Sequence, residues 1–433
     1  MDHAWRNWAD TARCHPARVS RPRTEAELAE AVRAAAAGGG RLRVAGAGHS
    51  FTAIACTDGT LVDLSDYRAV LAVDRAAGLV TVQAGITLAA LTAELHRHGL
   101  ALHNLGDIAY QSVAGAISTG THGTGATLGN LSTAVAGLRL VTADGTVLDC
   151  TADSEPELLA AARVGLGVLG VISTVTLRCV PAFTLHALEE TRRLSAVLGE
   201  LDTLVDGNDH FEFYWFPGTD WTTTKRNNRT TEPPRPRGRA AAFLGDVVLS
   251  NLVFGAVCRT AVRWPAASGV LRSVVPRLGT TEYSDASFRV FASPRLVRFA
   301  EMEYAMPRAA FPEVFEQVRR LADPLASHVV FPVECRWVAA DDIPLSPSSG
   351  RDTAYVAVHV VRGNDHEPYF RGVERILDSV GGRPHWGKLH YQDADVLAQR
   401  YPEWSRFQAL RPRVDPNGLF TNPYTDRVLG PAT

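Results

Sequence analysis

The sequence predicts an α+β chain of two or three domains. At 433 residues it is too long for one simple hydrophobic core. Segments with helical spacing of apolar residues are interleaved with segments that alternate apolar and polar residues. After Pro181 the composition shifts and an aromatic cluster appears at residues 211–216, which indicates a second domain of the α+β type.

Three helices are predicted in the first half of the chain. Residues 24–37 open with Thr24 as the N-cap and Glu27 three residues later, the pattern of a capping box, and apolar residues follow at helical spacing. Two further helices are expected at residues 88–98 and 156–164.

Strands are predicted between these helices, from alternation and from turn residues. Residues 70–74 and 79–83 form one hairpin, and residues 138–148 form another with Asp144-Gly145 at its turn. Shorter strands are expected at residues 43–45, 60–64 and 171–180.

The second half alternates strands and helices in the same way. Residues 226–239 are predicted to be an exposed, polar, proline-rich loop, and residues 415–424 to be a tail that returns to the first domain. Strands are expected at residues 301–304, 331–338 and 355–361, and helices at residues 308–321 and 368–379.

The segment around Gly46, Gly48 and His49 is the first candidate binding site. The two glycines permit a tight loop after the strand at 43–45, whose backbone N–H groups can approach a ligand without a Cβ in the way. Successive N–H groups of this kind form an anion-binding nest suited to a pyrophosphate. A glycine turn followed by a surface histidine explains the same residues, so this segment alone leaves both interpretations open.

Two further glycine-rich segments follow. Residues 111–125 are dense in glycine, serine and threonine, which favours a cofactor wall over a plain glycine loop. Residues 165–170 match G-x-G-x-x-G, but a dinucleotide fingerprint needs a strand before it and a helix after it. Here a helix precedes and a strand follows, so we reject this match as a fingerprint, although its backbone can still touch a ligand.

Three groups of polar residues stand out in the second half. Glu334 and Arg336 are two apart on a predicted strand, hence on one face, and such charges are costly inside an apolar strand unless they are paired. His359 lies on another predicted strand, and residues 383–390 place Lys388 in a loop with a tryptophan and two histidines. The alternatives are a structural ion pair at a sheet edge, a satisfied core histidine and a surface loop.

Composition argues against several classes of protein. The net charge of −2 gives no reason to expect a nucleic-acid partner. No stretch reaches the roughly 18 apolar residues that a membrane span needs, and the N-terminus shows no secretory signal. Six scattered cysteines and the absence of H-x-x-x-H spacing indicate reduced thiols and no metal. We therefore expect a cytoplasmic protein without a nucleic-acid partner, an integral membrane segment or a metal.

Four motifs together resemble one group of flavoproteins: Gly46-Ala-Gly-His-Ser-Phe51, Ser112-Val-Ala-Gly115, Thr119-Gly-Thr-His-Gly-Thr-Gly125 and His385-Trp-Gly-Lys388. They are similar to the aldonolactone oxidoreductase and alditol oxidase branch of the vanillyl-alcohol oxidase family, whose FAD domain is of the PCMH type. Within that branch the chain resembles the L-gulono-1,4-lactone dehydrogenases of actinobacteria. The similarity covers nearly the whole chain.

The resemblance implies an FAD-binding domain of two α/β subdomains at residues 1–180. It implies an α+β substrate (cap) domain at residues 181–433, whose tail, 412–433, returns to the first domain. FAD would be attached covalently to His49 through the 8α-methyl group of the flavin. The resemblance places the following residues at the cofactor: Ala45, Gly46, Ala47, Gly48, His49, Ser50, Gly106, Asp107, Ser112, Gly115, Thr119, Gly120, Thr121, His122, Ile172 and His385.

The implied activity is oxidation of a CH–OH group of a sugar 1,4-lactone, of the L-gulono or D-arabinono type, by hydride transfer to flavin N5. The flavin would be reoxidised by O2 or another electron acceptor. A polyol such as an alditol or xylitol, or another sugar or biosynthetic alcohol, is the alternative substrate. The catalytic residues carry over to Glu334, Arg336, His359 and Lys388, and the substrate contacts to Asp107, Glu334, Arg336 and Lys388.

Each of these groups has an expected role. Arg336 and Lys388 would stabilise the negative charge of the reduced flavin, and Glu334 would orient Arg336 and bind sugar hydroxyls. Either His359 or Lys388 would accept the hydroxyl proton. A non-catalytic flavin-binding or sugar-binding protein would not need this whole set of charged residues.

The chain also departs from its relatives. Asp107 stands where alditol oxidases have a serine, and Val361 where they have a threonine, which favours a lactone over an alditol. Gly106, beside the flavin, is small. In relatives a small residue there leaves oxygen a path, although glycine also occurs in dehydrogenases.

Overall fold

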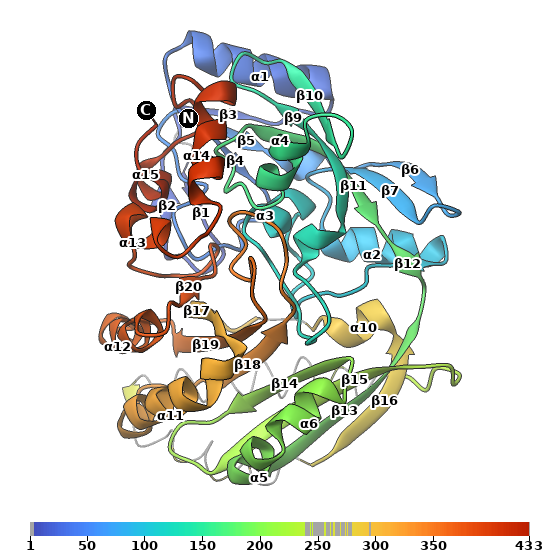
Figure 1. Ribbon diagram of the computed structural model, residues 1–433, viewed down its shortest axis with the longest axis vertical. Helices are drawn as coiled ribbons and strands as arrows, with labels where there is room; N and C mark the ends of the chain where they lie inside the picture. Colours follow the sequence, from blue (N-terminus) through green and yellow to red (C-terminus); the bar gives the residue numbers. More distant parts are fainter. Residues whose placement is uncertain are drawn as a thin grey trace.

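The structure is a computed structural model that describes residues 4–238, 279–293 and 296–432, together with single positions between 239 and 278. Figure 1 shows two halves, one above the other. In the upper half the N-terminal elements lie beside the C-terminal helices, and the lower half holds one large sheet. The chain passes to the large sheet between β12 (Val180–Pro181) and β13 (Thr184–Arg193). The division into domains at residue 180 stays a prediction.

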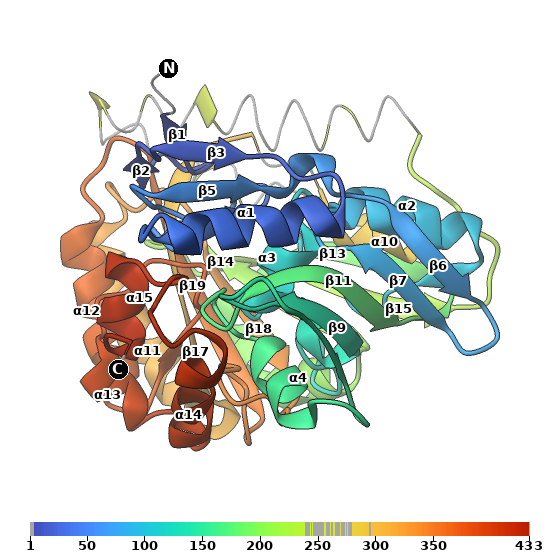
Figure 2. The same cartoon turned by 90° about the horizontal axis from the view of Figure 1, so that it is seen from above.

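A three-stranded parallel sheet in the order β3-β5-β4 forms the first layer. Its strands are β3 (Arg18–Ser20), β4 (Leu42–Ala45) and β5 (Thr60–Asp63). Helix α1 (Glu25–Ala37) provides the crossover that parallel strands need, and Figure 2 shows it lying along this sheet. Thr24 Oγ1 accepts a hydrogen bond from the Glu27 N–H at 3.2 Å. The Glu27 carboxylate accepts from Arg23 N–H, so only half of the predicted capping box forms.

A second sheet has five antiparallel strands in the order β10-β9-β11-β7-β6. Its strands are β6 (Val70–Asp74), β7 (Leu79–Gln83), β9 (Val135–Val141), β10 (Val147–Thr151) and β11 (Val171–Arg178). Both predicted hairpins are therefore confirmed. Besides α1, the helices in this part of the chain are α2 (Leu88–Arg97), α3 (Val113–Ser118) and α4 (Pro156–Ala162). One hydrophobic core joins the two sheets and these helices.

Two short pairs complete this half. β1 (Trp5–Arg6) pairs with β2 (Arg13–Cys14), and β8 (Leu100–Ala101) pairs with β12. The segment 165–170 lies between α4 and β11, with a helix before it and a strand after it, which confirms that it is no dinucleotide fingerprint.

The large sheet has eight strands in the order β16-β13-β15-β14-β18-β19-β17-β20. Besides β13, its strands are β14 (His210–Trp215), β15 (Trp221–Thr230), β16 (Thr281–Ala286), β17 (Phe299–Pro307), β18 (Val333–Val338), β19 (Thr353–Val361) and β20 (Arg383–Pro384). Its helices are α5 (Leu194–Gly199), α6 (Leu201–Asp206), α10 (Ser287–Phe291), α11 (Phe311–Ala322) and α12 (Glu367–Asp378). The predicted helix at 308–321 begins later, because residues 308–310 form a 3₁₀ turn.

The two faces of the large sheet differ in chemistry. Residues such as Phe213, Cys335 and Met302 belong to a second hydrophobic core that contains residues of α5, α6, α11 and α12. The alternate positions of the same strands carry Glu212, Tyr214, Glu301, Glu303, Glu334, Arg336 and His359. Because successive side chains on a strand point to opposite faces, these polar groups share the face that meets the first half.

The predicted loop at 226–239 is partly wrong. Residues 226–230 belong to β15, which pairs with β13 over ten positions from Thr184↔Thr230 to Arg193↔Trp221. Residues 231–238 are irregular and mostly exposed, and Arg239 lies outside the described residues. The strand extends because polar side chains on β15 find cross-strand partners, such as Arg226 with Glu190.

The last helices are α13 (Ala394–Ala398), α14 (Trp404–Val414) and α15 (Pro423–Leu429). The tail contacts the first half through backbone hydrogen bonds, from Leu42 N–H to the Leu419 carbonyl at 2.7 Å and from Ala143 N–H to the Val414 carbonyl at 3.0 Å. No described helix combines the length and the apolar character needed to span a bilayer.

Candidate active site

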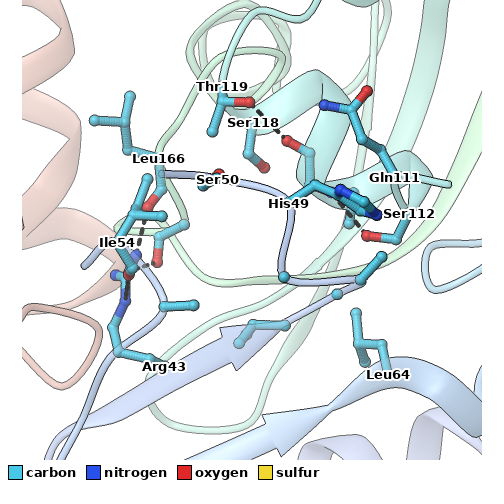
Figure 3. A pocket seen from close by; sticks show the side chains of 18 of the residues that line it. Arg43, His49, Ser50, Ile54, Leu64, Gln111, Ser112, Ser118, Thr119 and Leu166 are labelled. Atoms are coloured by element: carbon cyan, nitrogen blue, oxygen red, sulfur yellow. Dashed lines mark hydrogen bonds between the residues drawn. The ribbon is translucent and has the colours of Figure 1, made fainter. Parts of the chain in front are cut away.

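One pocket lies where the loop after β4 meets the start of α3. The empty space it encloses, open solvent included, is about 860 Å³. A Cβ on Gly46 would lie 1.9 Å from Ser112 Oγ, so only glycine fits at this point. Gly48 has φ +67°, a conformation that glycine adopts without strain. Figure 3 shows side chains from both segments around this pocket.

Most of the predicted cofactor residues line this pocket. They are Gly46, Ala47, Gly48, His49, Ser50, Ser112, Gly115, Thr119 and Ile172. The others lie outside its lining: Ala45, Gly106, Asp107, Gly120, Thr121, His122 and His385. Further lining residues were not predicted, among them Arg43, Ile54, Gln111, Ser118 and Leu166. Gly167 and Gly170 of the rejected fingerprint also line the pocket.

His49 lies between two aromatic rings. Its ring centroid is 5.8 Å from that of Trp8 and 6.3 Å from that of Tyr110, the latter in a stacked arrangement. Burial, and to a smaller extent the charge of Lys388, lowers the pKa of His49 to about 4. The imidazole is therefore neutral at physiological pH and keeps a lone pair on one nitrogen.

Arg336 is the centre of a charged cluster on the polar face of the large sheet. Its guanidinium lies 2.9 Å from Asp107 and 2.9 Å from Glu212, and it also contacts the carboxylate of Glu334. Lys225 on β15 lies 3.4 Å from Glu212 and 3.8 Å from Asp107. β18 lies between β14 and β19 in the sheet, so the pair Glu334 and Arg336 is not an ion pair at a sheet edge.

Tyr214 connects the three carboxylates of this cluster. Its hydroxyl lies 2.8 Å from Asp107, 3.0 Å from Glu334 and 3.2 Å from Glu212. A hydroxyl donates only one proton, so the other contacts are favourable only where a carboxyl carries a proton. Burial raises the pKa of Glu334 to about 7, although Arg336 acts in the opposite direction. Glu334 therefore shares a proton with its surroundings near neutral pH.

His359 and Lys388 both face Glu301 on β17. Lys388 forms an ion pair with the Glu301 carboxylate, and its Nζ lies 5.0 Å from the centroid of the Phe51 ring. Burial raises the pKa of Glu301, but the charges of Lys388 and His359 outweigh it and bring that pKa to about 2.

The orientation of His359 follows from its hydrogen bond. His359 Nδ1 lies 3.1 Å from the Pro332 carbonyl, which can only accept, so Nδ1 carries the proton. Nε2 lies 3.5 Å from Glu301 and 3.9 Å from Glu334.

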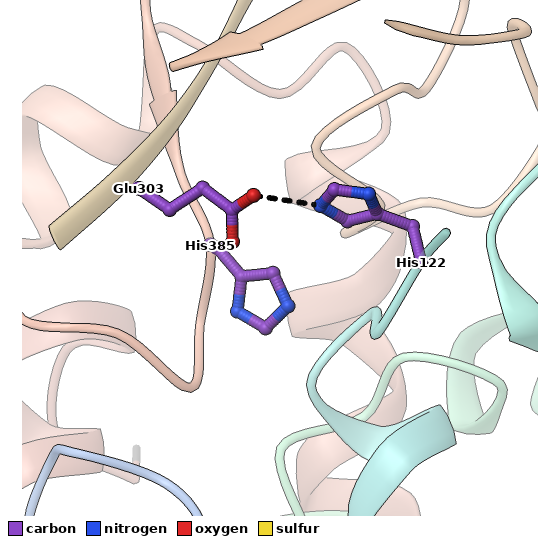
Figure 4. Close-up of side chains that lie close together, drawn as sticks. All are labelled: His122, Glu303 and His385. Carbon is purple, nitrogen blue, oxygen red and sulfur yellow. Dashed lines mark ion pairs between the residues drawn. The ribbon is translucent and has the colours of Figure 1, made fainter. Parts of the chain in front are cut away.

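A third group joins His122, Glu303 and His385, and Figure 4 shows His122 pointing at the Glu303 carboxylate with His385 beside them. His122 Nε2 lies 3.2 Å from Glu303, and its Nδ1 lies 2.8 Å from the Gly123 carbonyl. His122 can donate to both acceptors only as an imidazolium. His122 also brings the pKa of Glu303 well below its usual range, against the effect of burial.

The same three residues have ligand atoms within 4.8 Å of one another. His385 Nδ1 accepts a hydrogen bond from Gly387 N–H at 3.0 Å, so its proton is on Nε2, and burial lowers its pKa to about 3. A neutral His385 with a proton on Nε2 has no lone pair to offer a metal on that nitrogen. The group is better explained as a charge pair beside a neutral histidine.

The backbone joins these groups to the pocket. Phe51 N–H donates to the Gly387 carbonyl at 2.7 Å, which links the loop of His49 to the loop of Lys388. A Cβ on Gly106 would lie 2.9 Å from the His122 carbonyl oxygen, so backbone packing alone explains the glycine at this position. Its presence is therefore weak evidence about reaction with oxygen.

Glu212, Tyr214, Lys225, Glu301 and Glu303 were not predicted as site residues. For the three glutamates the signal in the sequence is an acidic residue at an alternate position of an apolar strand, as in Phe211-Glu-Phe-Tyr-Trp215 and Glu301-Met-Glu303. The predicted residues Asp107, Glu334, Arg336, His359 and Lys388 come together on one side of the large sheet.

The two halves match two family models. Residues 16–151 match the FAD binding domain model, and residues 175–428 match the D-arabinono-1,4-lactone oxidase model. The fold and the pocket thus define an FAD-dependent oxidoreductase. More specifically, the chain belongs to the D-arabinono-1,4-lactone oxidase family.

Relatives of known function align with the chain from end to end. L-gulono-1,4-lactone dehydrogenase of Mycobacterium tuberculosis (strain H37Rv) is 46% identical over 432 residues and covers 100% of both chains. L-gulonolactone oxidase of Bos taurus is 35% identical and covers 98% of both chains. Alditol oxidase of a Streptomyces species is 33% identical and covers 99% of this chain and 100% of its own.

A solved structure has the same fold. Cholesterol oxidase from B. sterolicum superposes with a TM-score of 0.81 at 18% identity, covering 100% of this chain and 97% of its own. This likeness supports the mixed α+β fold.

Proposed function

We propose that this protein oxidises a CH–OH group of a sugar 1,4-lactone of the L-gulono or D-arabinono type. The observation that carries the proposal is the polar face of the large sheet, where Glu334, Arg336, His359 and Lys388 gather beside the cofactor half. End-to-end similarity to an L-gulono-1,4-lactone dehydrogenase and to L-gulonolactone oxidases supports the substrate class. FAD accepts the hydride from the substrate carbon in such reactions.

The pocket residues fit FAD. The close approach of Gly46 to Ser112 and the positive φ of Gly48 produce a loop whose N–H groups suit a diphosphate. His49 would hold the flavin covalently through the 8α-methyl group. The lowered pKa of His49 supports this tether, because a neutral imidazole nitrogen can form the bond without first losing a proton.

The side chains on the polar face have different proposed roles in the reaction. Lys388 forms an ion pair with Glu301, and an ammonium group has no lone pair to accept a proton. The Pro332 carbonyl holds His359 Nδ1, which leaves Nε2 as the nitrogen that would accept the hydroxyl proton of the substrate when the imidazole is neutral. Lys388 and Arg336 would stabilise negative charge that develops near them, and Glu334, held by Arg336, would bind sugar hydroxyls.

Asp107 belongs to the same recognition surface. It contacts Arg336, and its second oxygen faces Lys225. An alditol is the second candidate substrate, because the chain is 33% identical to an alditol oxidase. The carboxylate at position 107 favours the lactone. O2 or another acceptor would take the electrons, and location in the cytoplasm remains a prediction.

Anaerobic mixing with L-gulono-1,4-lactone tests the proposal. The yellow protein should lose its visible flavin absorbance, and admission of air should restore it only if O2 is an acceptor. Acid precipitation should leave flavin on the wild-type protein and release it from the His49→Ala variant. A colourless purified protein, or a flavin bleached by xylitol and not by aldonolactones, would contradict the proposed activity.

A further inference from the structure

Arg43 is a buried cation in the wall of the cofactor pocket. It lies on β4, three residues before the glycine loop begins, and is only 3% exposed. Its Nε donates to the Ile54 carbonyl at 2.7 Å, and its Nη2 donates to the Leu166 carbonyl at 2.8 Å. Its Nη1 donates to the Gly167 carbonyl at 3.2 Å and to the Phe420 carbonyl. These four bonds leave one N–H group, on Nη2.

All four acceptors of Arg43 are backbone carbonyls, which carry no net charge. No ion pair joins its guanidinium to a carboxylate of residues 4–238, 279–293 or 296–432. Burial lowers the pKa of Arg43 to about 10, so the group remains charged at neutral pH. A buried charge without an opposite charge is costly, and proteins keep such groups where they are paired or where a ligand completes them.

The position of Arg43 indicates which part of a ligand would complete it. Arg43, Ile54, Leu166 and Gly167 all line the pocket. Figure 3 shows Arg43, Ile54 and Leu166 on one side of the pocket and His49 on the other. If the flavin ring is held at His49, the opposite side receives the ADP part of the cofactor.

We propose that Arg43 supplies the positive charge that neutralises the diphosphate of FAD, so that the pocket selects an anionic dinucleotide over an uncharged nucleoside. The charge acts together with the N–H groups of the loop at residues 46–50. The inference rests on the proposed tether at His49 only for the orientation of the cofactor. Arg43 also links three chain segments, those of Ile54, Leu166 and Phe420, through its hydrogen bonds to their carbonyls.

Arg411 provides a matched control. It is also buried, and its Nη1 donates to the Leu429 and Gly430 carbonyls at 3.1 Å and to Gln408 at 2.9 Å. Arg411 does not line the cofactor pocket. Its replacement therefore removes a buried guanidinium held by neutral acceptors without changing the charge of the pocket.

The experiment measures binding of FAD, ADP and adenosine by calorimetry. It uses the full chain carrying His49→Ala, so that the cofactor is not attached covalently and the ligands can be exchanged. Arg43→Met should weaken the binding of FAD and of ADP at least tenfold and change the affinity for adenosine by no more than twofold. Arg43→Lys should keep the preference for ADP over adenosine, because it keeps the charge. Arg411→Met should leave that preference unchanged, whatever it does to the unfolding temperature.

Several results would overturn the inference. If Arg43→Met weakens the binding of ADP and of adenosine equally, or leaves ADP binding unchanged, Arg43 has a structural role only. If Arg43→Met does not fold, Arg43→Lys decides: loss of the ADP preference in that variant, with adenosine binding intact, refutes a role for charge. A parent protein that binds no FAD would instead refute the cofactor on which the proposed function depends.

Discussion

Replacing Gly46 by alanine should damage the cofactor pocket by a mechanism that the structure specifies. The new Cβ would lie 1.9 Å from Ser112 Oγ and 2.9 Å from Ser112 Cβ. Rotating the serine hydroxyl away would break its N-cap bond to Gly115 N–H at 3.3 Å and would still leave the Cβ contact. Cap loss costs about 0.5–2 kcal/mol, and overpacking costs about 1–3 kcal/mol.

These energies translate into cofactor affinity because both groups belong to the pocket wall. At about 1.4 kcal/mol for each factor of ten, the overpacking cost of about 1–3 kcal/mol alone weakens FAD binding about 5- to 150-fold. The assay is flavin content of the purified Gly46→Ala protein, together with reconstitution by added FAD in a His49→Ala background. Circular dichroism and thermal unfolding check that the chain is folded.

A second substitution tests the reason for the damage. Ser112→Gly removes both atoms that the new Cβ would meet, and glycine at an N-cap costs only a few tenths of a kcal/mol (~0.3). The double variant Gly46→Ala, Ser112→Gly should therefore recover most of the flavin. Full flavin content in Gly46→Ala alone, or no recovery in the double variant, would refute the steric explanation.

Three further predictions concern the polar face of the large sheet. The raised pKa of Glu334 means that the folded protein holds its proton more tightly than the unfolded chain; the resulting stabilisation is present at low pH and is lost as the pH rises through about 7. Between about pH 5 and about pH 8 the free energy of unfolding of the wild type should therefore fall by up to about 3 kcal/mol more than that of Glu334→Gln, at ~1.4 kcal/mol per pKa unit. Equal pH dependence of thermal unfolding in the two proteins would contradict this. Asp107→Ser should raise the ratio of kcat/KM for xylitol over L-gulono-1,4-lactone about tenfold, and an unchanged ratio in steady-state kinetics would exclude Asp107 from substrate selection. Lys388→Met should slow anaerobic flavin reduction about 100-fold and lower stability, because Glu301 loses its buried partner; adding Glu301→Gln should restore the unfolding temperature but not the rate.

Several features of the fold and of the site follow from short segments of the sequence. The sequence marks Gly46 and Gly48 as a tight loop, and the positive φ of Gly48 is a requirement that acts locally. The requirement for glycine at position 46 comes from Ser112, which is distant in the chain. Glu334 and Arg336 were assigned to one face because the period of a strand is fixed. The two early hairpins followed from alternation and turn residues.

The partners of these residues depend on strand register, which one sequence does not specify. Glu212 reaches Arg336 because β14 and β18 pair in the register Glu212↔Arg336, and it reaches Lys225 because β14 and β15 pair in the register Glu212↔Lys225. β14 and β18 are also far apart in the chain. The sequence predicts a loop at residues 226–230 for the same reason, because these residues extend β15 by pairing with β13.

Both ends of the chain hold the loop that carries His49. From the N-terminal side, Trp8 N–H donates to the Gly48 carbonyl at 2.7 Å, and the Asn7 side chain donates to the Ser50 carbonyl at 2.9 Å. From the C-terminal side, the Asn422 side chain donates to the Ala53 and Cys56 carbonyls, each at 2.9 Å. The loop therefore has its full set of contacts only when residue 422 is in place, so removal of the segment around Asn422 should loosen a loop that lies more than 360 positions earlier in the sequence.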